Sequence, residues 1–165
     1  EHDENGVLIS DMYTDARKRR AMMEKRMRKE KGIAAAVPPP VLQGPKDADV
    51  TLIGWGSTQG VIEEARGLLA EQGITANQLQ IRWLVPLHGD AILEQVRNAK
   101  RTIIVENNYS GQFARYLRSE TSFVADGHIR KYDGEPFMPH HIADAVREQL
   151  AGETTLAGSA HEVMV

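Results

Sequence analysis

The chain has 165 residues, enough for one domain with a hydrophobic core and an additional arm. It contains no cysteine, which excludes disulfides, cysteine-ligated iron–sulfur clusters and thiol nucleophiles in this chain and agrees with a cytoplasmic location. No apolar run approaches the roughly 20 residues that span a membrane, and no secretory signal is visible, so no membrane partner is expected. The first residue is Glu1 rather than Met, which indicates a fragment, a processed product or an incomplete chain.

Charge divides the chain into two parts of opposite sign. Residues 1–46 hold 10 Lys and Arg against 7 Asp and Glu, a net charge of +3. Residues 47–165 hold 10 against 16, a net charge of −6. We therefore expect the two parts to attract one another or to bind different partners.

The first segment, residues 1–33, is predicted to form an arm around one basic helix, from about residue 14 to residue 31. Apolar side chains recur on one side of this helix at helical spacing, and nine Lys and Arg surround them. We expect Gly32 to end the helix, because glycine is common just after a helix C-terminus. The apolar stripe consists of Met12, Ala16, Met23 and Met27.

Residues 34–48 are predicted to be a linker. Three consecutive prolines at positions 38–40 favour extended polyproline II geometry, so the segment should act as a semi-rigid spacer. Residues 49–150 alternate between strand and helix patterns and should form the folded domain. Residues 151–165 contain small residues with little periodicity, and we expect a disordered tail there.

Short, mostly apolar runs alternate with amphipathic segments in residues 49–150, which is typical of an α/β fold. Such strands indicate a parallel sheet covered by helices on both faces. We predict strands at residues 50–55, 80–85 and 102–106, and a short one around 128–131. We predict helices from about residue 59 to Gly73, from Asp90, over residues 110–119, and from Pro139.

A glycine-rich turn joins the first predicted strand to its helix. Backbone N–H groups at a helix start suit anions, so Gly56, Ser57 and Thr58 are candidates for contact with an anionic ligand. The dinucleotide fingerprint and the Gly-Lys-Ser/Thr ending of a phosphate loop are both absent. A tight strand–helix turn with a Ser or Thr cap accounts for the same residues without any ligand.

Three amide side chains follow the predicted strand 102–106: Asn107, Asn108 and Gln112. Asparagine often bonds to the local backbone in turns, so helix capping accounts for one of them. Three amides in one loop also suit a shared hydrogen-bonding role at an interface. His88, just past the predicted strand 80–85, is a further candidate contact to a ligand or a neighbouring domain.

Other site chemistries lack their residue patterns. Six histidines are present, but none has the spacing of a metal site, and His140 and His141 diverge by about 100° on a helix. No G-x-S-x-G nucleophile elbow occurs. Aromatic residues make up 5% of the chain, too few for base stacking along RNA or single-stranded DNA. The basic helix offers electrostatic contact to nucleic acid, but packing on a neighbouring protein accounts for it better.

Several segments resemble one known family. Glu106–Gln112 resembles the Glu-Asn-Asn-x-x-Gly-Gln segment in the C-terminal part of 2-oxoacid:ferredoxin oxidoreductase α-subunits. Glu1–Gly6 resembles that family's Glu-His-Asp-Glu-x-Gly segment, and Met23–Lys29 resembles the basic helix after it. The resemblance covers nearly all of residues 1–150 and is strongest to subunits of the 2-oxoglutarate type. Further segments agree in the same order: Gly56–Thr58, Trp83–Pro86 and Lys131–Phe137.

The resemblance implies a transketolase C-terminal-like domain at residues 49–150, a three-layer α/β/α sandwich with a mainly parallel sheet, preceded by the helical arm. The complete enzyme would use thiamine diphosphate with Mg²⁺ to decarboxylate a 2-oxoacid. It would pass electrons through an iron–sulfur cluster to ferredoxin and transfer the acyl group to coenzyme A. This chain itself would hold no catalytic residue, metal or cofactor. It would support the other domains of the α-subunit and help to contact a β-subunit.

The residues leave a second hypothesis open, a non-enzymatic α/β interaction module. Such a module would bind an anionic ligand or a partner at the carboxyl edge of the sheet. Its candidate residues are Gly56–Thr58, His88, Asn107, Asn108 and Gln112.

Overall fold

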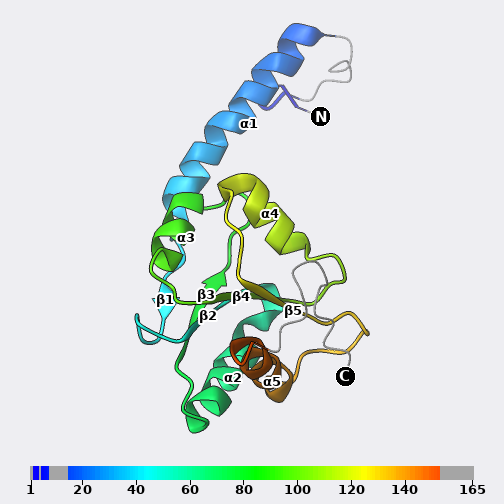
Figure 1. Cartoon of the computed structure of the whole chain (residues 1–165). Helices are drawn as coiled ribbons and strands as arrows, with labels where there is room; N and C mark the ends of the chain where they lie inside the picture. Colours follow the sequence, from blue (N-terminus) through cyan, green and yellow to red (C-terminus); the bar gives the residue numbers. More distant parts are fainter. Residues whose placement is uncertain (1, 4, 8–14, 153–165) are drawn as a thin grey trace. The chain divides into compact units, whose positions relative to one another are not determined.

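The computed structural model of the chain divides into two compact units, which we describe separately (Figure 1). The described residues are 2–3, 5–7 and 15–152. Unit 1 comprises Glu1–Pro38 and Val85–Leu87, and unit 2 comprises Pro39–Leu84 and His88–Val165.

Unit 1 contains the predicted basic helix, α1, at Ala16–Ala36. Asp15 caps its N-terminus, because the carboxylate accepts hydrogen bonds from the backbone N–H of Arg17 at 3.0 Å and of Lys18 at 3.2 Å. These bonds lower the pKa of the Asp15 carboxyl group, with the Lys18 bond as the largest cause. No residue of α1 is buried within this chain. Met12, the first member of the predicted apolar stripe, lies outside the described residues.

The predicted end of this helix at Gly32 is wrong. The helix continues to Ala36, so residues 34–36, which we assigned to the linker, are helical. Three alanines favour the helix, and a single exposed glycine costs only about 1 kcal/mol. The actual stop is Pro38, which disfavours helical geometry in the residue before it, and Val37 is accordingly extended, with φ −89° and ψ 138°.

Unit 2 is built on a five-stranded sheet with the order β1-β3-β2-β4-β5. Strands β2 to β5 run parallel to their neighbours, and only the two-residue β1 is antiparallel, at the edge beside β3. The mainly parallel sheet is therefore confirmed. Strand β1 falls in the predicted linker and was not expected. The strands are β1 (Leu42–Gln43), β2 (Val50–Trp55), β3 (Ala76–Ile81), β4 (Thr102–Glu106) and β5 (Gly127–Arg130).

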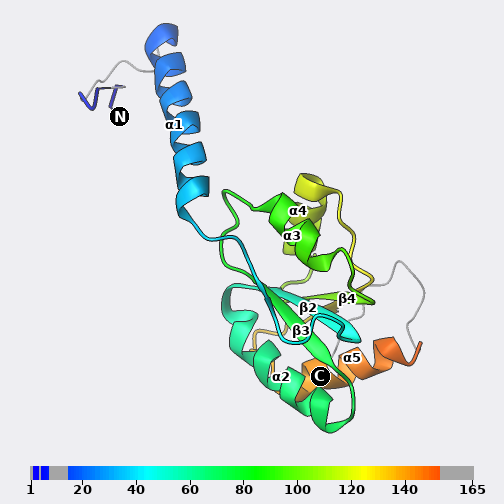
Figure 2. The ribbon, with the colours of Figure 1, turned by 90° about the vertical axis from the view of Figure 1, so that its left-hand side faces the viewer.

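Helices cover both faces of this sheet and complete the predicted three-layer α/β/α sandwich (Figures 1 and 2). One face carries α2 and α5, and the other carries α3 and α4. None of the helices in the described ranges is both long and apolar enough to cross a membrane. The helices of this unit are α2 (Gln59–Glu71), which follows the short 3₁₀ helix η1 (Gly56–Thr58), α3 (Gly89–Val96), α4 (Gln112–Thr121) and α5 (Pro139–Leu150).

The main core lies between the sheet and the α2–α5 layer. Leu52 and Ile103 from neighbouring strands are fully buried there, and Ile62 of α2 and Ile142 of α5 pack against the same cluster. Successive strand residues point to opposite faces, so the equally buried Ile53 lies toward the α3–α4 layer. Continuous burial of this kind explains why β2 and β4 were predicted correctly from their apolar runs.

The second strand differs from its predicted position. We expected a strand at residues 80–85, but β3 occupies Ala76–Ile81 and pairs with β2 over its whole length. Polar residues inside β3, including the fully buried Gln78, hid the strand from hydrophobic patterning. The apolar residues that suggested the later position lie beyond the strand, where Trp83 is 45% exposed and Val85 is 73% exposed.

Candidate functional site

Glu106, the last residue of β4, is completely buried and binds the start of α4. Its Oε2 atom accepts hydrogen bonds from the backbone N–H of Phe113 at 2.9 Å and from Asn108 Nδ2 at 2.7 Å. Its Oε1 atom accepts from the backbone N–H of Ala114 at 3.3 Å. A helix N-terminus favours an anion because its first N–H groups are unpaired and its dipole is positive there. Here that anion is a side chain of the protein itself.

The turn between β4 and α4 depends on Asn108 and Gly111. Gly111 precedes the helix with φ +64°, a left-handed conformation that glycine adopts without strain. Asn108 Oδ1 accepts a hydrogen bond from the backbone N–H of Gln112 at 3.0 Å. The helix therefore begins at Gln112, two residues after the predicted start at Ser110.

The three predicted amides do not share one role. Asn108 uses its oxygen to cap α4 and its amide nitrogen to bind Glu106, so both ends of this side chain serve the fold. Asn107 and Gln112 are exposed, and their proposed part in an interface stays a prediction. Glu106 was missed as a member of this cluster. A carboxylate that ends an apolar strand shortly before a helix start is the sequence signal that would have indicated it.

The predicted glycine-rich turn after β2 is a closely packed connection. Thr58 is buried, and its Oγ1 atom accepts from the backbone N–H of Trp55 at 3.1 Å and donates to the Trp55 carbonyl at 2.9 Å. A Cβ atom on Gly54 would lie 2.5 Å from Ile62 Cδ1 and 2.6 Å from Thr58 Oγ1, so any larger residue would force these side chains to shift. Packing thus explains Gly54 and Thr58 without a ligand. Ser57 is exposed, and its contact with an anion stays a prediction.

Two buried glutamines of β3 bind the backbone of this turn and of the start of α2 through hydrogen bonds. Gln78 Nε2 donates to the carbonyl of Gln59 at 3.0 Å, and Gln80 Nε2 donates to the carbonyl of Gly56 at 3.2 Å. Buried polar groups need such partners, because an unpaired amide in the core is costly. The predicted strand began four residues too late, so it included Gln80 but not Gln78.

The β2 and β4 turns lie beside each other at the carboxyl edge of the sheet. Their strands are neighbours, with Gly54 paired to Val105. The rings of Trp55 and Phe113 pack together with centroids 6.0 Å apart. The structure therefore brings two of the predicted site segments together. His88 is partly buried just before α3, where its carbonyl accepts from the backbone N–H of Ile92 at 3.0 Å, and its role as a ligand contact stays a prediction.

A buried lysine follows β5 at the same edge. The side chain of Lys131 is 1% exposed and forms an ion pair with Asp133, whose side chain is 40% exposed. The hydrogen bond from Lys131 is the largest cause that lowers the pKa of the Asp133 carboxyl group. In the sequence this segment is only a family marker. A lysine buried in this way is invisible to hydrophobic patterning, because lysine is ordinarily a surface residue.

His128 of β5 is partly buried between charges of both signs. Burial is the main cause that lowers the pKa of the His128 imidazole, and Arg130 lowers it further. Glu106 opposes both by raising it. Burial likewise is the largest cause of a lowered pKa at His141 in the first turn of α5. Both imidazoles therefore favour the neutral form in the folded protein.

These residues do not fit the metal or the cluster of the family. Across the described ranges, no three His, Asp or Glu side chains come together in a group that could hold a metal ion. The sequence has no cysteine to ligate an iron–sulfur cluster. That this chain alone binds no cofactor remains a prediction.

The fold and the edge described above define a class of protein domain. Residues 41–155 match the family model described as transketolase, C-terminal domain, and the chain belongs to that family. Its relatives are α-subunits of 2-oxoacid:ferredoxin oxidoreductases, which are enzymes. The family resemblance stated from the sequence is thereby confirmed.

Three relatives illustrate the match. The 2-oxoacid:ferredoxin oxidoreductase 2 α-subunit of Aeropyrum pernix is 37% identical over 153 residues, which are 91% of this chain and 23% of the relative. The solved 2-oxoglutarate:ferredoxin oxidoreductase from Magnetococcus marinus, with 2-oxoglutarate, coenzyme A and succinyl-CoA bound, superposes with a TM-score of 0.73 and 28% identity. That match covers 91% of this chain and 26% of the other.

The third relative is the α chain of a probable 2-oxoacid ferredoxin oxidoreductase from Thermoplasma acidophilum. It is 32% identical with a TM-score of 0.50, and the match covers 68% of this chain and 97% of the other. The present chain thus spans nearly all of the Thermoplasma chain. It spans only about a quarter of the length of the Aeropyrum and Magnetococcus proteins.

Proposed function

We propose that this chain is the C-terminal supporting domain, with its helical arm, of the α-subunit of a thiamine diphosphate-dependent 2-oxoglutarate:ferredoxin oxidoreductase. The complete cytoplasmic enzyme would decarboxylate the 2-oxoacid, transfer the acyl group to coenzyme A and reduce ferredoxin through an iron–sulfur cluster. Its catalytic residues would lie in other domains of the α-subunit and in a β-subunit. This chain would hold those parts in place.

The main observation in favour of a supporting role is that the Glu106 carboxylate makes only hydrogen bonds within the domain among the described contacts. Its carboxylate takes the anion position at the N-terminus of α4, and Asn108 completes the same cap. In this family segment, the carboxylate of Glu106 and the amide of Asn108 therefore join β4 to α4. A residue committed to three internal hydrogen bonds is poorly placed to bind a substrate anion.

The proposed substrate rests on likeness rather than on residues of this chain. The Magnetococcus protein, a 2-oxoglutarate enzyme, matches the arm as well as the sheet domain, because the match covers 91% of the chain. The Aeropyrum relative is named only as acting on 2-oxoacids. We therefore propose 2-oxoglutarate within the wider class of 2-oxoacids.

The test is an activity assay on the complex purified through a tag on this chain. Reduction of ferredoxin is followed with 2-oxoglutarate, pyruvate or 2-oxoisovalerate, each with and without thiamine diphosphate and coenzyme A. We expect the highest kcat/KM with 2-oxoglutarate and no activity without either cofactor. Preference for another 2-oxoacid would refute the substrate alone, and inactivity with all three would refute the enzyme.

A further inference from the structure

We propose that the exposed rings of Tyr109 and Tyr132, together with the partly buried Arg130 beside them, bind the part of the α-subunit that lies outside this chain; we call these three residues the tyrosine patch. The inference rests on the proposed function, because it takes that remaining part as the partner. It adds a defined contact surface to the supporting role.

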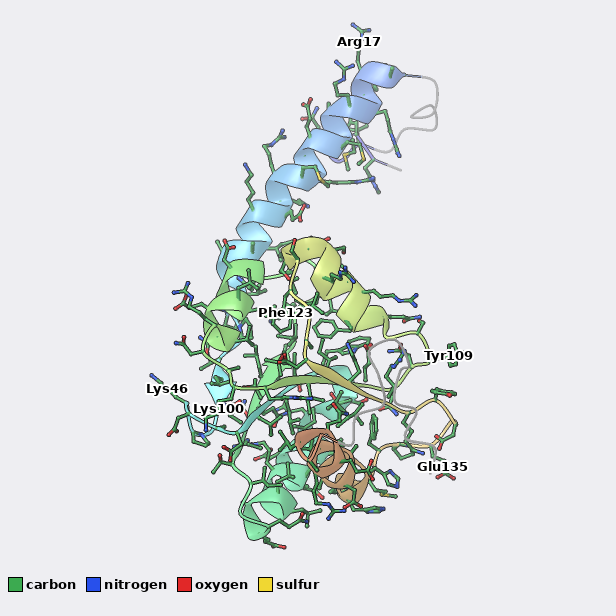
Figure 3. The ribbon with its side chains drawn as sticks, viewed as in Figure 1. Arg17, Lys46, Lys100, Tyr109, Phe123 and Glu135 are labelled. Carbon is green, nitrogen blue, oxygen red and sulfur yellow. The ribbon has the colours of Figure 1, made fainter. Side chains whose placement is uncertain are left out.

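The tyrosine patch joins two loops at the carboxyl edge of the sheet. Tyr109 lies in the loop after β4 and Tyr132 in the loop after β5, and their rings meet edge to face with centroids 4.9 Å apart at 86°. Arg130 Nη1 donates to the Tyr109 carbonyl at 2.7 Å and so fixes the first loop against β5. Figure 3 shows Tyr109 at the outer side of the ribbon.

Both rings remain open to solvent although they touch each other. Tyr109 is 68% exposed and Tyr132 is 41% exposed. A single exposed apolar side chain is ordinary, and Val124, 61% exposed before the amino end of β5, is such a case. Two aromatic rings in contact beside an arginine are different, because tyrosine and arginine are the residues enriched in the centres of protein interfaces.

The tyrosine patch is also held rigid before any partner binds. Glu106 and Asn108 anchor the base of the Tyr109 loop to the start of α4, and Arg130 anchors the Tyr109 carbonyl. Preorganised tyrosines give contact area with little loss of conformational entropy on binding. The arrangement therefore suits a permanent contact rather than a surface that adapts to several partners.

The lengths of the Aeropyrum and Magnetococcus relatives point to the occupant. This chain matches 23% of the Aeropyrum subunit and 26% of the Magnetococcus chain, so about three quarters of each polypeptide lies outside the match. A domain within such a polypeptide meets the remainder at high effective concentration. We therefore assign the remainder of the α-subunit to the tyrosine patch, rather than a β-subunit, ferredoxin or a second copy.

Photo-cross-linking in the intact complex tests this assignment. The complex is purified through this chain with p-benzoylphenylalanine in place of Tyr109, and a matched preparation carries it in place of Val124. We expect a cross-linked product at position 109 and little or none at position 124, because only position 109 lies in the proposed interface. Mass spectrometry should map the product to α-subunit residues outside residues 1–165. Cross-links to a β-subunit, ferredoxin or a second copy, or equal yields at the two positions, would overturn the proposal.

Hydroxyl-radical footprinting of the unmodified complex gives a second readout that needs no substitution. Tyr109 and Tyr132 should be protected in the complex, whereas Val124 should be labelled. Labelling of both tyrosines at the rate expected for their exposure in this chain would overturn the proposal. The activity assay on the same preparation separates the two failures. An active complex with unprotected tyrosines refutes only the tyrosine patch, and an inactive complex with protected tyrosines refutes only the proposed function.

Discussion

The carboxylate of Glu106 accepts a hydrogen bond from the backbone N–H of Phe113 at 2.9 Å, so the end of β4 is joined directly to the start of α4. The bond forms in a fully buried setting, where an ionised acceptor is stronger than a neutral one. The family segment Glu106–Gln112 is therefore a structural joint between a central strand and the helix that covers it.

We expect Glu106→Gln to destabilise the protein by about 2 kcal/mol, because hydrogen bonds to a charged acceptor are lost and an amide NH₂ faces backbone donors. Urea unfolding followed by circular dichroism measures the change. Glu94→Gln is the matched control, since the Glu94 side chain is 59% exposed and pairs with Arg97 on the surface of α3. The control should change stability by less than about 0.5 kcal/mol. Equal effects of the two substitutions would contradict the role of Glu106.

Two glycine-to-alanine substitutions should change the free energy of unfolding in opposite directions. A Cβ atom on Gly54 would lie 2.5 Å from Ile62 Cδ1 and 2.6 Å from Thr58 Oγ1, so Gly54→Ala should cost about 1–3 kcal/mol through overpacking. Gly67, within α2, has nothing within 4 Å of such an atom. Gly67→Ala should stabilise by about 0.5–1 kcal/mol through helix propensity. Thermal unfolding of both variants checks the prediction, and a tolerated alanine at position 54 would refute the packing explanation.

The two partners of the ion pair after β5 should respond unequally to substitution. Lys131→Met leaves the half-exposed Asp133 carboxylate able to regain water, and the methionine fills a similar volume. Asp133→Asn instead leaves the ammonium of Lys131 at 1% exposure without its carboxylate. We therefore expect the larger loss of stability from Asp133→Asn. Denaturant unfolding ranks the two variants, and the reverse order would mean that the lysine is hydrated through another route.

The stability of the protein should fall as the pH drops below about 6.5, the ordinary pKa of histidine. Burial lowers the pKa of both His128 and His141, so the unfolded chain binds protons that the folded chain does not. The contribution of these groups is fully present above the unfolded pKa and is lost as the pH falls through the folded pKa. His141 Nδ1 also accepts from the backbone N–H of Met138 at 3.2 Å, a bond that protonation would break.

Unfolding free energies measured between pH 8 and pH 5 test this dependence. His141→Gln should flatten the decline in that range, because it removes one titrating group and keeps a possible acceptor. The exposed neighbour His140 is the control position. His140→Gln should reduce the pH dependence of the unfolding free energy less than His141→Gln does. A slope that is unchanged in His141→Gln would show that other groups dominate.

Elements with strong local signals were predictable from the sequence. The β4 strand follows directly from the apolar run that ends at Glu106, and α5 begins at Pro139 as expected. Gly73 ends the α2 segment with φ +77°, in the left-handed geometry that makes glycine a common helix stop. In these places a few neighbouring residues decide the backbone conformation.

Elements that depend on distant contacts were not predictable in the same way. Gln78 and Gln80 look unsuited to a buried strand, yet their amides reach the carbonyls of Gln59 and Gly56 in a segment about 20 residues earlier. Strand β1 forms only because Leu42–Gln43 meets the free edge of β3. These partners lie far away in the sequence, so no local pattern contains them. Hydrophobic periodicity therefore predicts β3 at the wrong position and gives no sign of β1.

The α/β class, the basic arm and the family could all be read from the chain, because apolar runs, charge and short motifs are properties of neighbouring residues. The complete burial of Glu106 and of Lys131 became visible only in the folded structure. Folding also brought Tyr109 and Tyr132 into contact from two loops. The contact between Tyr109 and Tyr132 joins two separate loops and exists only once β4 and β5 align their carboxyl ends at one edge. The burial of Glu106 and Lys131 depends on the helices and strands packed around them, which no run of neighbouring residues specifies.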